Sequence, residues 1–371
     1  MPRVRRTAAA LVAVLATAAC TGGGETGPTQ RTGPDGAPAL LGTVDLDAAV
    51  DGATRLRDLA AVPGGAPVAL LGDGDSRGWL VEVAPGEDGP AAMTVLEIPG
   101  VGADAELAVL PDGTYLVAGT SPTAGYQLLT VRPDGQATIT GLGLRPDRAA
   151  TALSPDGRML YAALALADVR PAQLYAVDLT AGVVHTTAPV VPDGTVTALT
   201  TRPDGGLAAL VEADGRALLV RYDADLRPVG EPVDLAPDAP VSSPADLDVT
   251  ADGTAVATVH VGDARSRGRL VTVVDGEVRS SVELDGTGDS ALDVVVSPDG
   301  RSAWVPLADL SFPAELVTLD LASGERIAAV PLCPGAGVLG DVAPVGEDAG
   351  LVVTGSCIDG DAPTATAFLV G

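Results

Sequence analysis

The feature that most constrains the fold is a repeat of nearly even length that occupies most of the chain. Each unit has an apolar run, a turn of the Pro-Asp-Gly type and a second apolar run, as in LSPDGRMLYAA at 153–163 and VSPDGRSAWVP at 296–306. The middle turn residues lie 48, 44, 48, 48, 47 and 48 positions apart, at Gly64, Asp112, Asp156, Asp204, Asp252, Asp299 and Glu347. This rhythm predicts seven copies of one structural unit.

The sixth unit indicates what one copy contains. Its apolar segments, 292–297, 302–307, 315–321 and 326–332, are short, rich in β-branched residues and separated by turn residues, without a helical period. Four short strands in each unit of this length are the signature of a β-propeller blade. The sequence therefore predicts an all-β, seven-bladed β-propeller, with Asp156 and Asp299 as turn residues between the first two strands of their blades.

The ends of the repeat region predict how the ring closes. The last unit is one strand short, and a strand-like segment at 39–46 precedes the first full unit. We expect this N-terminal strand to complete the last blade, so that no free sheet edge remains at the seam. Residues 39–371 are accordingly interpreted as a single domain.

The first 38 residues carry a different signal. Residues 1–19 combine three arginines near the start with an apolar run at 8–19, which is too short for a permanent transmembrane helix but typical of a secretory signal peptide. The run ends in LATAAC, which resembles a bacterial lipobox and implies lipidation of Cys20. Residues 20–38 read as a flexible tether. We expect an extracytoplasmic protein anchored by lipid to the cell membrane, with plain secretion as the alternative.

The repeats also resemble a known family. The segments SPDGRMLYAALALADVRPAQLYAVDLTAGVV and SPDGRSAWVPLADLSFPAELVTLDLASGERIAAVPL are similar to the YVTN-type propeller repeat, which also occurs in lactonase-like propellers. The resemblance implies a propeller that works outside the cytoplasm, and members of the family are mostly binding proteins. We therefore expect a non-catalytic scaffold for a protein or a small ligand.

Acidic residues recur at one position of the predicted innermost strands. Five units have an acid five residues before the proline position of the turn, whereas the other two have Ala150 and Ala198. The acids are Asp58, Glu106, Asp246, Asp293 and Asp341. Carboxylates gathered around a channel suit a divalent cation such as calcium, and they equally suit acceptance of backbone N–H groups.

A metal-dependent, lactonase-like or other hydrolase at this acidic channel is the alternative to binding. A serine hydrolase would need a base, and the two histidines are His185, expected on an outermost strand, and His260. His260 could meet Asp246 and one of Ser242 and Ser243 in a Ser-His-Asp grouping. The chain has no nucleophile elbow around either serine.

The remaining composition bears on cysteines and partners. With Cys20 lipidated, Cys333 and Cys357 form an even pair, for which an oxidising compartment favours a disulfide over two buried thiols. A formal net charge of −27 repels phosphate backbones, so nucleic acid is not expected as a partner. We expect a monomer whose only contact with the membrane is the lipid anchor.

Overall fold

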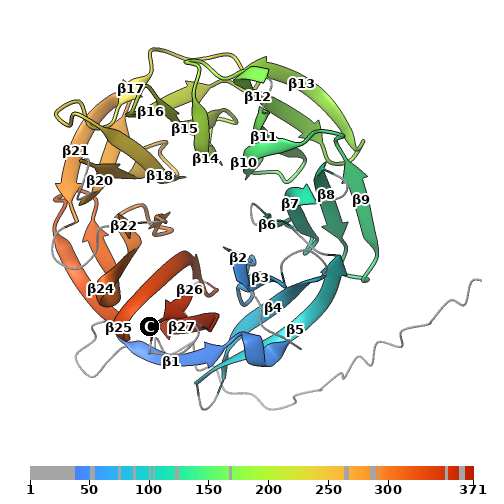
Figure 1. The fold of residues 1–371 in the computed structure, drawn as a ribbon, viewed down its shortest axis with the longest axis vertical. Helices are drawn as coiled ribbons and strands as arrows, with labels where there is room; N and C mark the ends of the chain where they lie inside the picture. The colour runs from blue at the N-terminus through green and yellow to red at the C-terminus, as the bar shows by residue number, and fades with distance from the viewer. Residues whose placement is uncertain are drawn as a thin grey trace, which may run out of the picture.

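The computed structural model describes residues 38–50, 55–73, 77–86, 89–99, 102, 105–121, 125–166, 169–262, 267–284, 290–291, 293–346, 350–358 and 364–371. The described residues form antiparallel sheets arranged in a ring around a central opening (Figure 1). The predicted signal peptide, Cys20 and all but the last residue of the predicted tether lie outside the described residues. Within the described part of the chain the helix is η1 (Asp47–Ala49), and no helix there is long and apolar enough to cross a membrane.

Five blades are separate four-stranded sheets in which consecutive strands pair. Blade one contains β2 (Arg55–Ala60), β3 (Val68–Gly72), β4 (Arg77–Gly86) and β5 (Gly89–Pro99). Blade two contains β6 (Glu106–Val109), β7 (Tyr115–Ser121), β8 (Gly125–Val131) and β9 (Ala137–Gly141). Blade three contains β10 (Pro146–Leu153), β11 (Met159–Leu166), β12 (Val169–Asp178) and β13 (Val183–Pro189). Blade four contains β14 (Thr195–Thr201), β15 (Leu207–Ala213), β16 (Arg216–Tyr222) and β17 (Val233–Asp234), and blade five β18 (Ser242–Val249), β19 (Ala255–Val261), β20 (Arg267–Val274) and β21 (Glu277–Glu283).

Blades six and seven share one sheet because the long strand β25 is the outermost strand of blade six at its start and the innermost strand of blade seven at its end. This sheet contains β22 (Ser290–Ala291), β23 (Val295–Val296), β24 (Ser302–Asp320), β25 (Arg326–Pro344), β26 (Leu351–Cys357), β27 (Thr366–Val370) and β1 (Leu40–Asp45). The residues on either side of β24 lie next to each other, because the N–H of Leu321 donates to the carbonyl oxygen of Arg301 at 2.8 Å. Where the sequence indicated four separate strands in the sixth unit, the structure has a divided first strand and two continuous ones.

The predicted closure of the ring is confirmed. Strand β1 pairs antiparallel with β27, from Leu40 opposite Val370 to Asp45 opposite Thr366. The N-terminal strand is thus the outermost strand of the last blade, and the edge of β27 is covered by backbone hydrogen bonds. The seven-bladed propeller expected from the repeat is therefore the fold of the described residues.

The hydrophobic core is divided among the interfaces between blades. The described residues form seven apolar clusters, and each cluster takes its members from two neighbouring blades. The second strand of a blade is covered on both faces, as in β3, where every residue is buried. The outermost strands β13 and β21 instead alternate between exposed and partly buried residues. The burial of both faces explains why the second strand of a blade is a continuous apolar run in the sequence.

The Pro-Asp-Gly motifs form turns, as the repeat predicted. In the third blade Gly157 has φ of 68° and its N–H donates to the Ser154 carbonyl oxygen at 2.8 Å. Asp156 Oδ1 accepts the N–H of Arg158 at 3.1 Å and the hydroxyl of Ser154 at 2.6 Å. These bonds hold the pKa of Asp156 below its usual range. The side chain of this aspartate therefore shapes the turn.

The expected disulfide is present at the boundary of blades six and seven. Cys333 lies in β25 and Cys357 ends β26, with Cα atoms 5.5 Å apart and the sulfurs bonded. The bridge joins the outer part of blade six to the second strand of blade seven. It closes a loop over a sequence separation of 24, which in the chain-entropy account stabilises the fold by roughly 3 kcal/mol.

Two turn glycines offer a graded test of this geometry. Gly253 has φ of 88° and an added Cβ would meet nothing within 4 Å, whereas a Cβ on Gly157 would lie 2.9 Å from Pro111 Cδ. We expect Gly253→Ala to lower the free energy of unfolding by about 1 kcal/mol through the left-handed backbone alone. Gly157→Ala should cost roughly 2 kcal/mol or more because a contact with the neighbouring blade is added. Urea unfolding of both variants measures this, and equal losses would contradict the contact.

Candidate functional site

The five predicted acids line one cavity inside the ring. The cavity has a volume of about 400 Å³ and is bounded by the innermost strands of the blades. Its lining includes Asp58, Glu106, Asp246, Asp293 and Asp341. Each side chain keeps some surface towards the channel but is otherwise surrounded by protein. The sequence position shared by these acids is thus one place in space.

Carboxyl groups in blades one and two bind backbone groups of the following blade. Asp58 Oδ1 accepts the N–H of Leu59 in its own strand at 2.7 Å, and Asp58 Oδ2 accepts the N–H of Leu107 in blade two. Glu106 Oε2 accepts the N–H of Thr151 in blade three at 2.8 Å and also the Thr151 hydroxyl. The acid of one blade therefore bridges to the residue that follows the equivalent position in the next blade.

The same bridge recurs on the other side of the ring. Asp246 Oδ2 accepts the N–H of Val294 at 3.1 Å, which links blades five and six. Asp293 Oδ1 accepts that N–H at 2.7 Å, while its Oδ2 accepts the N–H of Val342 in blade seven at 2.7 Å. The interpretation of the acids as acceptors of backbone N–H bonds is confirmed for these four side chains.

Burial, and then the proximity of other acids, raises the pKa values of four of the five acids. Burial raises the pKa of Asp58 to about 6, against hydrogen bonds from Leu107 and Leu59. Burial, together with the charge of Asp58, raises the pKa of Glu106 to about 8. The pKa values of Asp293 and Asp341 also lie well above the usual range, chiefly through burial and then through neighbouring carboxylates. The cavity is therefore a place where negative charge is costly.

The hydrogen bonds of the five acids do not test whether they also bind a divalent ion. Among the described residues there is no group of three or more His, Cys, Asp or Glu side chains arranged to hold a metal ion. Binding of calcium by Asp58, Glu106, Asp246, Asp293 and Asp341 stays a prediction.

Two features of the channel were missed by sequence reasoning. Asp248 lies two residues after Asp246 on β18, and its Oδ2 accepts the N–H of Val296 in blade six at 2.8 Å. The same-face period of a strand could have indicated this second bridge. Arg57, next to Asp58, is the only cation among the described residues that line the cavity, and no pattern in the sequence set it apart.

The part of the cavity wall formed by blades three and four has no carboxyl group. These blades, which lack the recurring acid, contribute mainly small or aliphatic side chains, together with Thr151 and Thr197. They include Ala150, Ala152, Leu160, Ala198 and Leu199. The cavity is thus two-sided, with carboxyl groups on one part of the ring and hydrocarbon on the other.

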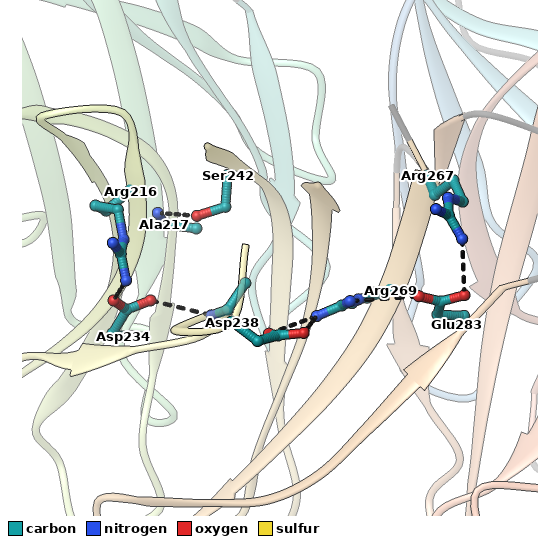
Figure 2. A network of polar contacts seen from close by, with 9 residues as sticks. Arg216, Ala217, Asp234, Asp238, Ser242, Arg267, Arg269 and Glu283 are labelled. Carbon is teal, nitrogen blue, oxygen red and sulfur yellow. Dashed lines mark hydrogen bonds and ion pairs between the residues drawn. The ribbon is translucent and has the colours of Figure 1, made fainter. Parts of the chain in front are cut away.

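Where neighbouring blades are not bridged by one of the five acids, other hydrogen bonds and ion pairs hold the two blades together. At the joint of blades four and five, Ser242 Oγ accepts the N–H of Ala217 at 2.9 Å. On the outer side Arg269 contacts Asp238 at 2.8 Å and Glu283 at 3.3 Å (Figure 2). The Ser242 and Asp238 contacts hold blade five to blade four and to the segment between them without placing charge in the cavity, while Glu283 fixes Arg269 within blade five.

The alternative Ser-His-Asp grouping is only partly assembled. Ser243 and His260 lie opposite each other in the pairing of β18 with β19. Ser242 is buried and accepts a backbone N–H, while the carboxylate of Asp246 faces the cavity and Val294. His185 is exposed on the outermost strand β13, as expected.

Comparison with solved structures places the fold among propeller-type proteins. The chain is similar to a protein from Lactobacillus plantarum (TM-score 0.56, 18% identity, covering 77% of this chain and 88% of that one). It is similar to a putative 6-phosphogluconolactonase from Bacteroides uniformis (0.55, 17%, 74% and 85%) and to hydrazine synthase from Kuenenia stuttgartiensis (0.54, 18%, 68% and 76%). No protein-family model and no curated protein sequence matches. At these identities the likeness shows the fold.

The raised pKa of Glu106 predicts that stability falls as the pH rises. The folded protein keeps a proton on Glu106 up to a pH of about 8, whereas an ordinary glutamate loses it near 4.5. Between these values the folded state binds more protons than the unfolded chain, so each increase in pH favours unfolding. We expect Glu106→Gln to raise the free energy of unfolding by about 1–3 kcal/mol at pH 8 and to leave it nearly unchanged at pH 4.

Urea unfolding from pH 8 down to a pH below the lowered pKa of Asp112 measures the effect, and Asp112→Asn is a control of opposite sign. The N–H of Thr114 donates to Asp112, which lowers the pKa of that turn carboxyl. Its stabilisation is present above the ordinary aspartate pKa and is lost in acid, so the control should destabilise at pH 8 and not at low pH. A pH-independent effect of Glu106→Gln would contradict the account.

Proposed function

We propose that this chain is an extracytoplasmic, lipid-anchored binding propeller whose central cavity holds a small organic cation with an apolar part, without a chemical reaction. The observation that carries the proposal is the two-sided lining of the cavity. A volume of about 400 Å³ lies within the range of small-molecule sites.

Electrostatics favour a positively charged guest. Five carboxyl groups and one guanidinium line the cavity, and burial, followed by the charges of neighbouring carboxylates, raises the pKa of Glu106, Asp293 and Asp341. A cation inside the cavity would relieve this repulsion, because an opposite charge nearby favours the ionised carboxylates. An anionic guest would add to the repulsion.

The placement of the acids favours an organic cation. A metal ion needs several oxygens within about 2.6 Å of one point, and the described side chains form no such group. An ammonium group on a carbon skeleton can donate hydrogen bonds to one part of the ring while its hydrocarbon contacts the wall formed by Ala150, Ala198 and Leu199.

The ligand class can be tested with 2-phenylethylammonium chloride and its neutral analogue 2-phenylethanol. We expect the ammonium compound to bind in isothermal titration calorimetry and to raise the melting temperature, whereas the alcohol should do neither. Glu106→Gln should weaken binding. Asp299→Asn should not, because Asp299 lies in an exposed turn outside the cavity. Calcium chloride serves as a third ligand. Equal binding of amine and alcohol would show that the carboxyl groups do not select charge.

Location is a separate part of the proposal. The disulfide between Cys333 and Cys357 supports an oxidising compartment, and the lipobox-like LATAAC supports lipidation of Cys20. In a bacterial host we expect the parent chain to fractionate with membranes and Cys20→Ser to appear in the aqueous phase of a detergent partition. Equal distribution of the two would contradict the anchor. The expectations of a monomer and of no nucleic-acid partner stay predictions.

The alternative is a lactonase-like hydrolase, which the putative 6-phosphogluconolactonase among the similar structures brings into consideration. A phosphorylated lactone is anionic, and it would meet five carboxyl groups in this cavity. Asp246 is also directed away from a triad, towards Val294. Calcium-dependent and chelator-sensitive hydrolysis of a neutral lactone would favour this alternative over binding.

A further inference from the structure

Asp341 is the exception among the channel acids. In the bridges described above, the carboxyl group of one blade accepts the N–H that follows the equivalent position in the next blade. For Asp341 in blade seven the corresponding donor is Leu59 N–H in blade one. That N–H donates instead to Asp58 Oδ1 at 2.7 Å. Within the described residues, the carboxyl group of Asp341 receives no hydrogen bond from another residue.

The surroundings of Asp341 make its isolation costly. The side chain lines the cavity and is enclosed by protein. The ionisable groups that line the cavity with it are Arg57 and Asp58 on β2, Glu106 on β6, Asp246 on β18 and Asp293 before β23. Asp58, Asp246 and Glu106 each raise its pKa, in addition to the larger effect of burial. An enclosed carboxyl group without a hydrogen-bond donor keeps its proton to a higher pH than an ordinary aspartate does.

We propose that Asp341 is the group that receives the ammonium end of the ligand, and that one proton leaves the channel when the ligand enters. This inference rests on the proposed function, and it adds the residue and the proton exchange. On binding, the O–H bond of the Asp341 carboxylic acid breaks and its proton passes to the buffer. The carboxylate accepts a hydrogen bond from the ammonium group, which keeps all of its own protons.

Asp341, which lies where blade seven meets blade one, can take up a ligand without breaking a hydrogen bond between blades. The other four acids would each lose a backbone N–H partner if they turned to a ligand. Asp341 has no such bond to give up, and its own N–H donates to Thr354 Oγ1 at 3.2 Å, which fixes the backbone. Asp341 can thus bind a cation without loosening a joint between blades.

The test is calorimetric titration of the full-length protein with 2-phenylethylammonium chloride at pH 7, in phosphate and in Tris. Because the two buffers differ in ionisation enthalpy, the difference in binding heat counts protons. We expect release of about one proton by the parent protein. Asp341→Asn, isosteric with the protonated acid, should abolish the release and weaken binding roughly tenfold to a hundredfold.

Asp248→Asn is the matched control, because Asp248 is an enclosed acid with a raised pKa that bridges to Val296 and does not line the cavity. It should leave proton release and affinity unchanged. Equal binding and equal proton release by the parent and Asp341→Asn would overturn this inference while the proposed function stands.

A measurement without ligand separates the two claims further. The infrared difference spectrum between the parent and Asp341→Asn at pH 7 should contain the carbonyl stretch of a protonated carboxyl group, because Glu106 contributes equally to both proteins and cancels. A parent protein that does not bind the amine would overturn the proposed function and, with it, this inference. Absence of the carbonyl band from the difference spectrum would overturn the protonated state of Asp341 on its own.

Discussion

The innermost strand of each blade has one edge without a neighbouring strand, and this constraint governs the channel. Backbone N–H groups on such an edge need acceptors when they are turned away from bulk water. Carboxyl groups of the preceding blade supply them at Leu107, Thr151, Val294 and Val342. The bond that satisfies the edge also ties two blades together, next to the apolar cluster between them. The ring is therefore fastened at its centre as well as through its core.

Aspartate suits this bridge because it has two acceptor oxygens. Asp58 and Asp293 each use one oxygen for an N–H of their own strand and the other for an N–H of the next blade. An asparagine side chain has a single acceptor and could make one of these bonds. The consequence is a concentration of carboxyl groups in a small enclosed volume, where burial and then the neighbouring carboxylates raise the pKa values of Glu106, Asp293 and Asp341. The need of the strand edges for hydrogen-bond acceptors therefore opposes the electrostatic repulsion among the carboxyl groups in the cavity.

The sequence predicts the fold because its period is long, even and carried by residues with fixed local roles. Pro-Asp-Gly turns at Asp156 and Asp299, the strand at 39–46 and the pair Cys333 and Cys357 could be interpreted without coordinates. The bridges could not, since they depend on how far each blade is rotated relative to the next. The repeat aligned Asp341 with Asp58, but only the structure shows that Asp58 accepts an N–H of the next blade, from Leu107, whereas Asp341 accepts none from the described residues of blade one. The acids recur at one position of the sequence repeat, but their hydrogen-bond partners are not the same in every blade.

The blades without a channel acid show that fastening and cavity chemistry can be separated. Between blades three and four, Thr201 Oγ1 donates to the Leu153 carbonyl oxygen at 2.8 Å. Between blades four and five the bonds lie at Ser242 and, outside the core, at Asp238 and Arg269. With the joints held by these neutral or exterior contacts, Ala150 and Ala198 can present hydrocarbon to the cavity. The two-sided lining follows from where each joint places its polar groups.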